Sequence, residues 1–134
     1  MLSVKLNHLD AHTLRRRELA KGYSEALAHL PVVVPTEADD RTHVYHLYVV
    51  ELRDRVQRDA LRAHLLTLGI HAGIHYPHPV HLQPAYQGVL RVGAMARTER
   101  LADTVLSLPL FPELTDPDHQ RVCVGVIDFF NQRP

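Results

Sequence analysis

The stretch His43-Val44-Tyr45-His46-Leu47-Tyr48-Val49-Val50 is the most strand-like part of this sequence and sets its fold class. β-Branched and aromatic residues occupy both of its faces, which predicts a central strand over 43–51. A capped amphipathic helix follows over 54–68, and the apolar run 70–74 then returns as a strand. This order of strand, helix and strand predicts a small layered unit in which helices pack on a sheet.

The helix over 54–68 carries the clearest boundary signals. Asp54 and Gln57 form a capping-box pattern at its start, and Gly69 supplies a left-handed stop at its end. Two imidazoles of the preceding strand, His43 and His46, could be ligands, but partly buried strand histidines with hydrogen-bond partners are the favoured interpretation.

The fold class predicted for the whole chain is α+β. A short helix is expected over 97–106, and a last helix should start near Thr115 and include the run 122–130. Residues 88–94 are expected to be irregular, with Arg91 exposed. Helices should cover one face of a small sheet, whose strands are expected near 32–34, 43–51, 70–75 and 106–110.

The N-terminal thirty residues give one long helical signal. At 1.5 Å per residue this helix would be roughly 40 Å long, more than the diameter of about 30 Å expected for a compact domain of this size. Part of its apolar stripe should therefore overhang and need a partner outside this core. The stripe runs at spacings of four and three through Leu2, Leu6, Leu9, Thr13, Arg16, Ala20, Tyr23, Leu27 and Leu30.

The composition indicates one soluble globular domain. The chain has 134 residues, of which 46% are hydrophobic and 22% charged, and its fifteen basic residues balance fifteen acidic ones. This balance gives no electrostatic case for binding nucleic acid or an anionic membrane. A single cysteine, Cys123, excludes an internal disulfide and a cysteine-based zinc site, and it is expected in the core. Without a long apolar run, a cytoplasmic location is expected.

The segment Gly73-Ile74-His75-Tyr76-Pro77-His78-Pro79-Val80-His81-Leu82-Gln83-Pro84-Ala85-Tyr86 concentrates the polar chemistry of the chain. Its three prolines exclude a regular helix or a central strand and predict a stiff, extended loop. A loop that is ordered before binding loses little entropy when a ligand docks. This segment is therefore the expected ligand-facing element.

Several chemistries are compatible with this loop. His75, His78 and His81, with His71 as a possible fourth ligand, could bind a metal, but a spacing of three on an extended chain does not bring imidazoles together. His81 could act as a general acid or base, although no nucleophile motif accompanies it.

The favoured interpretation of the loop is ligand binding. His75, Tyr76, His81 and Gln83 would supply donors and acceptors to a hydroxyl-rich ligand. The remaining alternative is a rigid turn whose polar groups satisfy the local backbone.

Several motifs of this chain together resemble the C-terminal part of proteins of the DegT/DnrJ/EryC1/StrS family. These proteins are pyridoxal-phosphate-dependent aminotransferases that act on nucleotide-linked keto-sugars. The resemblance covers nearly the whole chain and rests on the strand 43–50, Leu68-Gly69-Ile70, the loop motifs Gly73-Ile74-His75-Tyr76-Pro77 and His81-Leu82-Gln83-Pro84-Ala85-Tyr86, then Glu99-Arg100-Leu101-Ala102 and residues 106–115.

The resemblance implies a division of the chain at residue 30. Residues 1–30 would be the long helix that links the family's two domains, and 31–134 the small C-terminal α+β domain of a fold-type I enzyme. The large domain that holds pyridoxal 5'-phosphate, with its Schiff-base lysine, would be absent. The only lysines, Lys5 and Lys21, lie outside any motif resembling the cofactor lysine, so the chain alone is expected to bind no cofactor and to contain no catalytic residue.

The resemblance also implies partners. The substrate would be a nucleotide sugar, contacted by His75, Tyr76, His81 and Gln83, and the amino donor an amino acid such as glutamate. The missing large domain and a second subunit of a homodimer would cover the overhanging helix. The alternative is a stand-alone, non-catalytic module that binds a sugar nucleotide or a partner protein.

Overall fold

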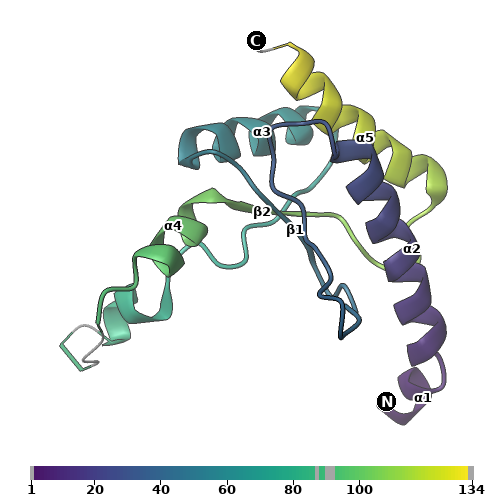
Figure 1. The fold of residues 1–134 in the computed structure, drawn as a ribbon, viewed down its shortest axis with the longest axis horizontal. Coiled ribbons are helices and arrows are strands. Elements are labelled where there is room, and N and C mark those ends of the chain that lie inside the picture. Colours follow the sequence, from purple (N-terminus) through teal and green to yellow (C-terminus); the bar gives the residue numbers. More distant parts are fainter. Residues whose placement is uncertain (1, 87, 90–92, 133–134) are drawn as a thin grey trace.

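The structure is a computed structural model that describes residues 2–86, 88–89 and 93–132 (Figure 1). The predicted exposure of Arg91 lies outside these described residues. The helices over 9–27, 55–67 and 116–131 gather around one face of a small central sheet, and the helix over 96–104 lies apart from them. The fold is α+β, as predicted.

The sheet contains two antiparallel strands, β1 (Tyr48–Glu51) and β2 (Val105–Leu108). Both other predicted strands are reduced to single bridges, in which Val33 pairs with Glu51 and Gly73 pairs with Ser107. The four segments thus lie in the order Val33, β1, β2, Gly73. Prolines explain the shortening near Val33, since Pro31 and Pro35 cannot donate to a strand ladder.

Residues 43–47 do not form the first half of the predicted central strand. The carbonyls of His43 and Val44 accept hydrogen bonds from Arg17 and Arg16 rather than from a neighbouring strand. The His43 ring accepts the N–H of Tyr45 at 2.8 Å, and Tyr45 has a φ of +46°, outside the extended region. His43 is exposed on the surface, as is His46, so the partly buried strand histidines were a wrong prediction.

The helices with predicted capping residues begin and end close to the positions that the sequence indicates. Helix α3 (Arg55–Thr67) begins after Asp54, whose carboxylate accepts the N–H of Gln57 at 2.8 Å. Gly69 follows its end with a φ of +73°, the left-handed conformation predicted. Helix α5 (Asp116–Asn131) begins after Thr115, which caps it through Asp118. Helix α4 (Ala96–Thr104) ends two residues earlier than predicted because Val105 already pairs in β2.

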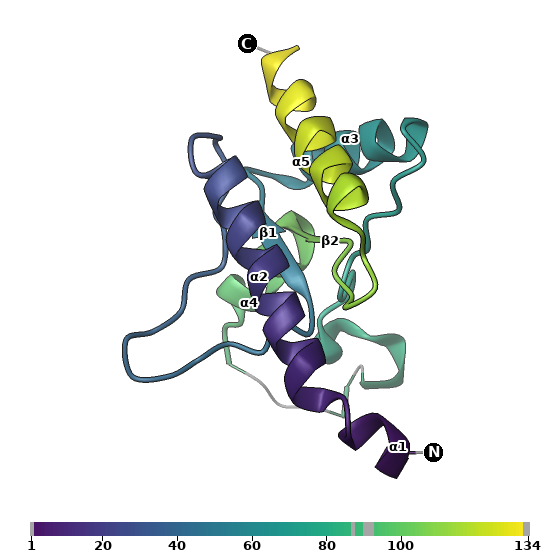
Figure 2. The same ribbon diagram turned by 90° about the vertical axis from the view of Figure 1, so that its right-hand side faces the viewer.

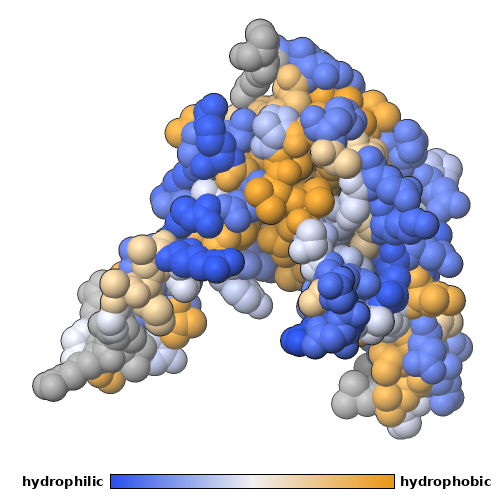
Figure 3. Space-filling view, in the orientation of Figure 1, coloured by the Kyte–Doolittle hydropathy of each residue, from blue (hydrophilic) through white to orange (hydrophobic). Residues whose placement is uncertain are grey.

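The predicted N-terminal helix is broken into α1 (Leu2–Leu6) and α2 (Leu9–Leu27). The prediction of one continuous helix to Leu30 was therefore wrong. The two halves of its apolar stripe differ in burial, as expected. The stripe residues in the second half of α2 are buried, whereas Leu6 and Leu9 in the first half of the stripe are exposed. Figure 3 shows hydrophobic side chains gathered on the projecting part of the molecule formed by α1 and the start of α2. Val4, Leu6, Leu9 and Leu14 are each about half exposed or more.

The core lies between the sheet and helices α2, α3 and α5. Tyr48 and Val50 of β1 point into it together with Leu106 of β2, and all three are fully buried. The alternate residues Val49 and Val105 point to the opposite face of the sheet. That opposite face is left for the loop and helix α4.

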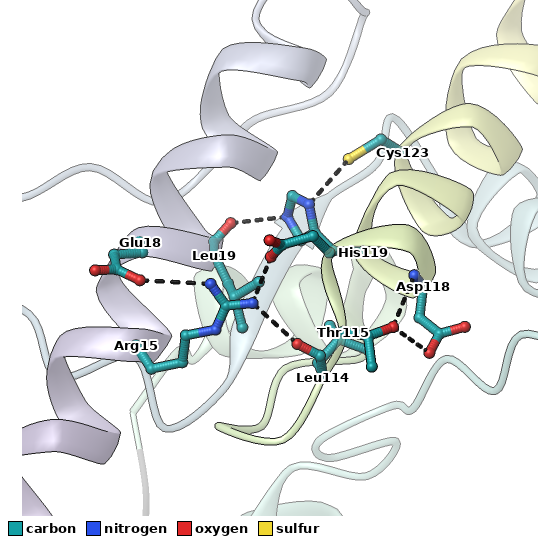
Figure 4. Close-up of polar contacts among 9 residues, drawn as sticks. Arg15, Glu18, Leu19, Leu114, Thr115, Asp118, His119 and Cys123 are labelled. Carbon is teal, nitrogen blue, oxygen red and sulfur yellow. Dashed lines mark hydrogen bonds and ion pairs between the residues drawn. The ribbon is translucent and has the colours of Figure 1, made fainter.

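Helix α2 is attached to α5 by a polar junction (Figures 2 and 4). Arg15 donates to the carbonyl of Leu114 at 3.1 Å and pairs with Asp116 at 2.5 Å. The His119 Nε2 lies 2.9 Å from the carbonyl of Leu19, so this nitrogen carries the hydrogen. The ring rests over Gly22, where an added Cβ would lie only 2.8 Å from it. Since Arg16 and Arg17 bond to the carbonyls of Val44 and His43, all three arginines of the cluster 15–17 contact other parts of the chain.

Acidification is expected to weaken this junction through His119. Burial lowers the pKa of His119, and the nearby Arg15 cation lowers it further, against the opposing effects of the Leu19 carbonyl and the Asp116 carboxylate. The remaining neighbours, Tyr23 and Cys123, are uncharged at neutral pH. The unfolded chain therefore takes up the proton first. The stability contributed by His119 is complete above its unfolded pKa of about 6.5 and is lost as the pH falls from there toward the lower folded value.

Urea unfolding between pH 5 and 8 measures this effect. The matched variant is His119→Gln, which keeps a donor toward Leu19 but cannot titrate. We expect the wild-type chain to lose more stability than this variant as the pH falls below about 6.5. Parallel curves for the two proteins would contradict the prediction.

Candidate functional site

The proline–histidine segment is an ordered loop on the sheet face opposite the core. It starts at Gly73, which is bridged to Ser107, and continues through two short 3-10 turns, η1 (Val80–Leu82) and η2 (Pro84–Tyr86). The turns close on themselves, since Leu82 donates to Pro79 and Tyr86 to Gln83. The loop contains no regular α-helix or strand, as predicted, but its two turns make it less extended than predicted, and its stiffness stays a prediction.

A pocket of about 390 Å³ lies between this loop, helix α4 and the outer face of the sheet. Its polar groups come mainly from the loop, and its apolar floor comes from the sheet and α4. Such a combination suits a ligand that has both flat and hydroxyl-bearing parts. The lining residues are Val49, His75, Tyr76, His78, Pro79, Val80, Gln83, Thr98, Leu101, Ala102 and Val105.

Three of the four predicted binding residues line this pocket. They are His75, Tyr76 and Gln83, and Tyr76 is 75% exposed. The fourth, His81, is not among the lining residues. Its side chain is only 8% exposed, and its Nε2 lies 3.0 Å from the Glu99 carboxylate of α4. The structure therefore separates His81 from the three residues with which it was grouped.

His75 is held in place by the sheet. Its Nδ1 lies 2.9 Å from the Ser107 hydroxyl of β2, and its ring meets the Tyr76 ring edge-on at 5.8 Å. Gly73 is needed for this arrangement, because a Cβ there would lie 2.5 Å from His75 Cε1. His75 is thereby oriented at the pocket while remaining exposed to a ligand.

The sequence interpretation missed the half of the pocket that comes from other elements. Thr98 and Leu101 belong to α4, while Val49 and Val105 belong to the sheet. The alternation of inward and outward residues along the two strands was the available signal for Val49 and Val105. No local pattern distinguished Thr98 from other polar helix residues.

The described residues do not bring together the metal ligands considered for the loop. Within residues 2–86, 88–89 and 93–132, no group of three or more His, Cys, Asp or Glu side chains is arranged to hold a metal ion.

Cys123 is 1% exposed, and burial raises the pKa of its thiol to about 11, so it is a core residue as predicted.

The lysines do not fit a Schiff-base role either. Lys5 lies exposed on α1, and Lys21 lies on the surface of α2, 3.8 Å from Glu25. A reactive lysine must be desolvated or placed beside another cation, and neither position provides this. None of the described helices is long and apolar enough to cross a membrane.

Comparison with known proteins identifies the family. Residues 1–127 match the DegT/DnrJ/EryC1/StrS aminotransferase family. The chain is 44% identical over 128 residues to dTDP-3-amino-3,4,6-trideoxy-α-D-glucose transaminase of Streptomyces venezuelae, covering 94% of this chain and 33% of that protein. It is 39% identical to a pleiotropic regulatory protein of Geobacillus stearothermophilus, over 97% of this chain and 35% of the relative.

Solved structures agree with this match. The crystal structure of S. venezuelae DesV in complex with a ketimine intermediate superposes with a TM-score of 0.89 and 42% identity, over 96% of this chain and 34% of that one. A family aminotransferase from Brucella abortus superposes with a TM-score of 0.87 and 32% identity, with the same coverage. The chain therefore belongs to the DegT/DnrJ/EryC1/StrS aminotransferase family, and it spans about a third of the length of the curated relatives it matches.

Proposed function

We propose that this chain is the small C-terminal domain of a pyridoxal-phosphate-dependent aminotransferase and forms one wall of its nucleotide-sugar site. The amino group would come from an amino acid, with glutamate as the proposed donor, and would pass to a keto-sugar. Residues 1–30 would connect this domain to the large domain, which would supply the cofactor and its lysine. The observation that carries the proposal is the pocket into which His75, Tyr76 and Gln83 converge.

The chemistry of the pocket supports a sugar nucleotide as its ligand. Sugar hydroxyls need donors and acceptors in close proximity, which the His75 ring and the Gln83 amide provide. Tyr76 adds an aromatic face at the opening, and Val49 and Val105 form an apolar floor. The dTDP-sugar transaminase of S. venezuelae supports the proposed class of ligand through its 44% identity.

The bare half of the N-terminal stripe supports an assembly with further protein. Val4, Leu6, Leu9 and Leu14 are exposed along α1 and the start of α2. Leu6 and Leu9 belong to the stripe whose later residues are buried in α2. An apolar surface of this kind marks a protein contact. We propose that the large domain and the second subunit of a homodimer cover it.

The second candidate is a stand-alone module that binds a sugar nucleotide without catalysis. Neither Lys5 nor Lys21 lines the pocket, which favours this candidate for the chain taken by itself. The two candidates share the pocket and differ in whether a cofactor-bearing partner completes it.

A chimera separates these candidates and tests the pocket. It carries this chain in place of the matching third of the S. venezuelae transaminase. We expect this chimera to be active, and Gln83→Ala in it to raise KM for the sugar nucleotide about three- to tenfold, the effect of losing one hydrogen bond to a neutral group. The value of kcat should change less, because the reacting atoms lie elsewhere. Steady-state kinetics measure both parameters.

The matched control for this prediction is Gln120→Ala, which removes an exposed amide from α5 far from the pocket. Its KM should equal that of the unmodified chimera. An inactive but folded chimera would favour the stand-alone module. Equal KM values for the Gln83 and Gln120 variants would argue against the pocket as the sugar-nucleotide site.

A further inference from the structure

We propose that Glu99 is a positioning residue, whose bond to His81 holds the loop against helix α4 and thereby sets the width of the pocket. This inference rests on the proposed function in one respect, that the pocket binds a nucleotide sugar. It gives His81 a role different from the direct contact predicted from the sequence.

The first support is the isolation of the loop from the rest of the fold. Leu82, Gln83, Tyr86 and Val89 all donate their backbone N–H groups to acceptors within the segment itself. Among the described residues of 76–89, the bond from His81 to Glu99 is the one hydrogen bond that reaches another element. Without it, the segment would be held to α4 by apolar contacts alone.

The second support is the geometry of this bond. A carboxylate can only accept hydrogen bonds, so the His81 Nε2 at 3.0 Å must be the donor. The His81 side chain is 8% exposed, whereas that of Glu99 is 48% exposed. The imidazole is therefore packed in a fixed orientation between the loop and the helix. Charge-assisted bonds of this kind are stronger than neutral ones.

The third support is that α4 is itself fixed to the domain. The neighbouring Arg100 forms an ion pair with Glu51 of β1. Asp103, one turn further on, lies 3.5 Å from Arg55 of α3. Glu99 thus lies on a helix whose position is fixed by contacts with the sheet and α3. A loop bonded to Glu99 is therefore also held at a fixed position relative to the sheet.

The bond also joins the two walls of the pocket at matching points. On the loop, Val80 and Gln83 line the pocket on either side of His81 in the sequence. On α4, Thr98 and Leu101 line it on either side of Glu99. A change in the Glu99–His81 distance would therefore move both walls relative to each other. A site held at its ligand-bound width before binding avoids the entropy cost of ordering.

Two substitutions of Glu99 in the present chain test the proposal. Glu99→Ala removes the acceptor, and Glu99→Gln keeps an acceptor oxygen without the charge. The first readout is hydrogen exchange, by NMR, of the Leu82 and Gln83 amides in and beside η1. We expect exchange in the alanine variant to be about three- to tenfold faster, as for a partly exposed charge-assisted bond. The glutamine variant should recover most of the protection.

Two controls separate positioning from general stability. The Ile70 amide, which donates to Leu65 at the end of α3, should exchange at an unchanged rate. Glu113→Gln removes the same charge from an exposed position in the loop before α5 and should leave all these rates unchanged. A uniform increase in exchange across the domain would show a structural role only, and would overturn the proposal.

The second readout is the affinity of each variant for dTDP-glucose, measured by NMR titration. Glu99→Ala should raise Kd, by a factor no larger than that by which it accelerates exchange in η1, because affinity falls only as the fraction of binding-competent loop falls. A faster-exchanging loop with unchanged Kd would overturn the positioning role, as would unchanged exchange. Failure of dTDP-glucose to bind the wild-type chain, or a Gln83→Ala variant that binds as the wild type does, would count against the proposed function. The exchange rates would still decide whether Glu99 holds the loop.

Discussion

Replacement of Tyr23 by alanine should lower the free energy of unfolding by about 3–5 kcal/mol, the cost typical of deleting a buried aromatic side chain. Tyr23 is fully buried where α2 meets the sheet and α5. Its ring lies 4.1 Å from that of His119 and 5.0 Å from that of Tyr48, measured between centroids. Its hydroxyl donates to the carbonyl of Pro109 at 2.8 Å. Deleting the side chain would remove packing and a buried hydrogen bond together.

Tyr23→Phe divides this effect into its parts. It keeps the ring and leaves the Pro109 carbonyl without its donor, which should cost about 1–3 kcal/mol. Tyr86→Ala serves as the surface comparison, because its side chain is 40% exposed in η2. Urea denaturation at pH 7.5 measures all three variants. If Tyr23→Ala lowered the free energy of unfolding by less than about 1 kcal/mol, the packing of Tyr23 would not be what holds α2 in place.

Replacement of Leu65 by alanine should cost about 2–5 kcal/mol, the range for a fully buried leucine whose removal leaves a cavity. Leu65 is buried in α3 and faces α5. The two helices are so close there that a Cβ on Gly125 would lie 3.1 Å from Leu65 Cδ2. Backbone held at this distance by several side chains cannot collapse freely into the space of one missing side chain. The cost should therefore fall in the upper half of the range.

The adjacent residue supplies a matched control for this prediction. Leu66 lies next along α3 but is 56% exposed, so Leu66→Ala should change stability by less than about 0.5 kcal/mol. The same denaturation experiment compares the two variants. Equal losses at positions 65 and 66 would contradict the packing described for α3 and α5.

The sequence alone determined the features that depend on neighbouring residues. Asp54 and Thr115 cap helices because a capping side chain needs only the N–H groups two or three positions further along the chain. Gly69 adopts its positive φ for an equally local reason. The prolines exclude a regular α-helix or strand from the loop. In each case the competing conformations are excluded by sterics or by short-range hydrogen bonds.

Only the tertiary structure decided which partner each remaining group took. His43 and Val44 have strand-forming neighbours, yet their carbonyls are bound by arginines of α2, so β1 begins at Tyr48. His81 belongs to the same loop motif as His75, but it reaches Glu99, eighteen residues away, and leaves the pocket wall. Bonds between distant residues depend on how the helices dock on the sheet. No local pattern records that docking, because its energy comes from surfaces that meet only after the chain has folded.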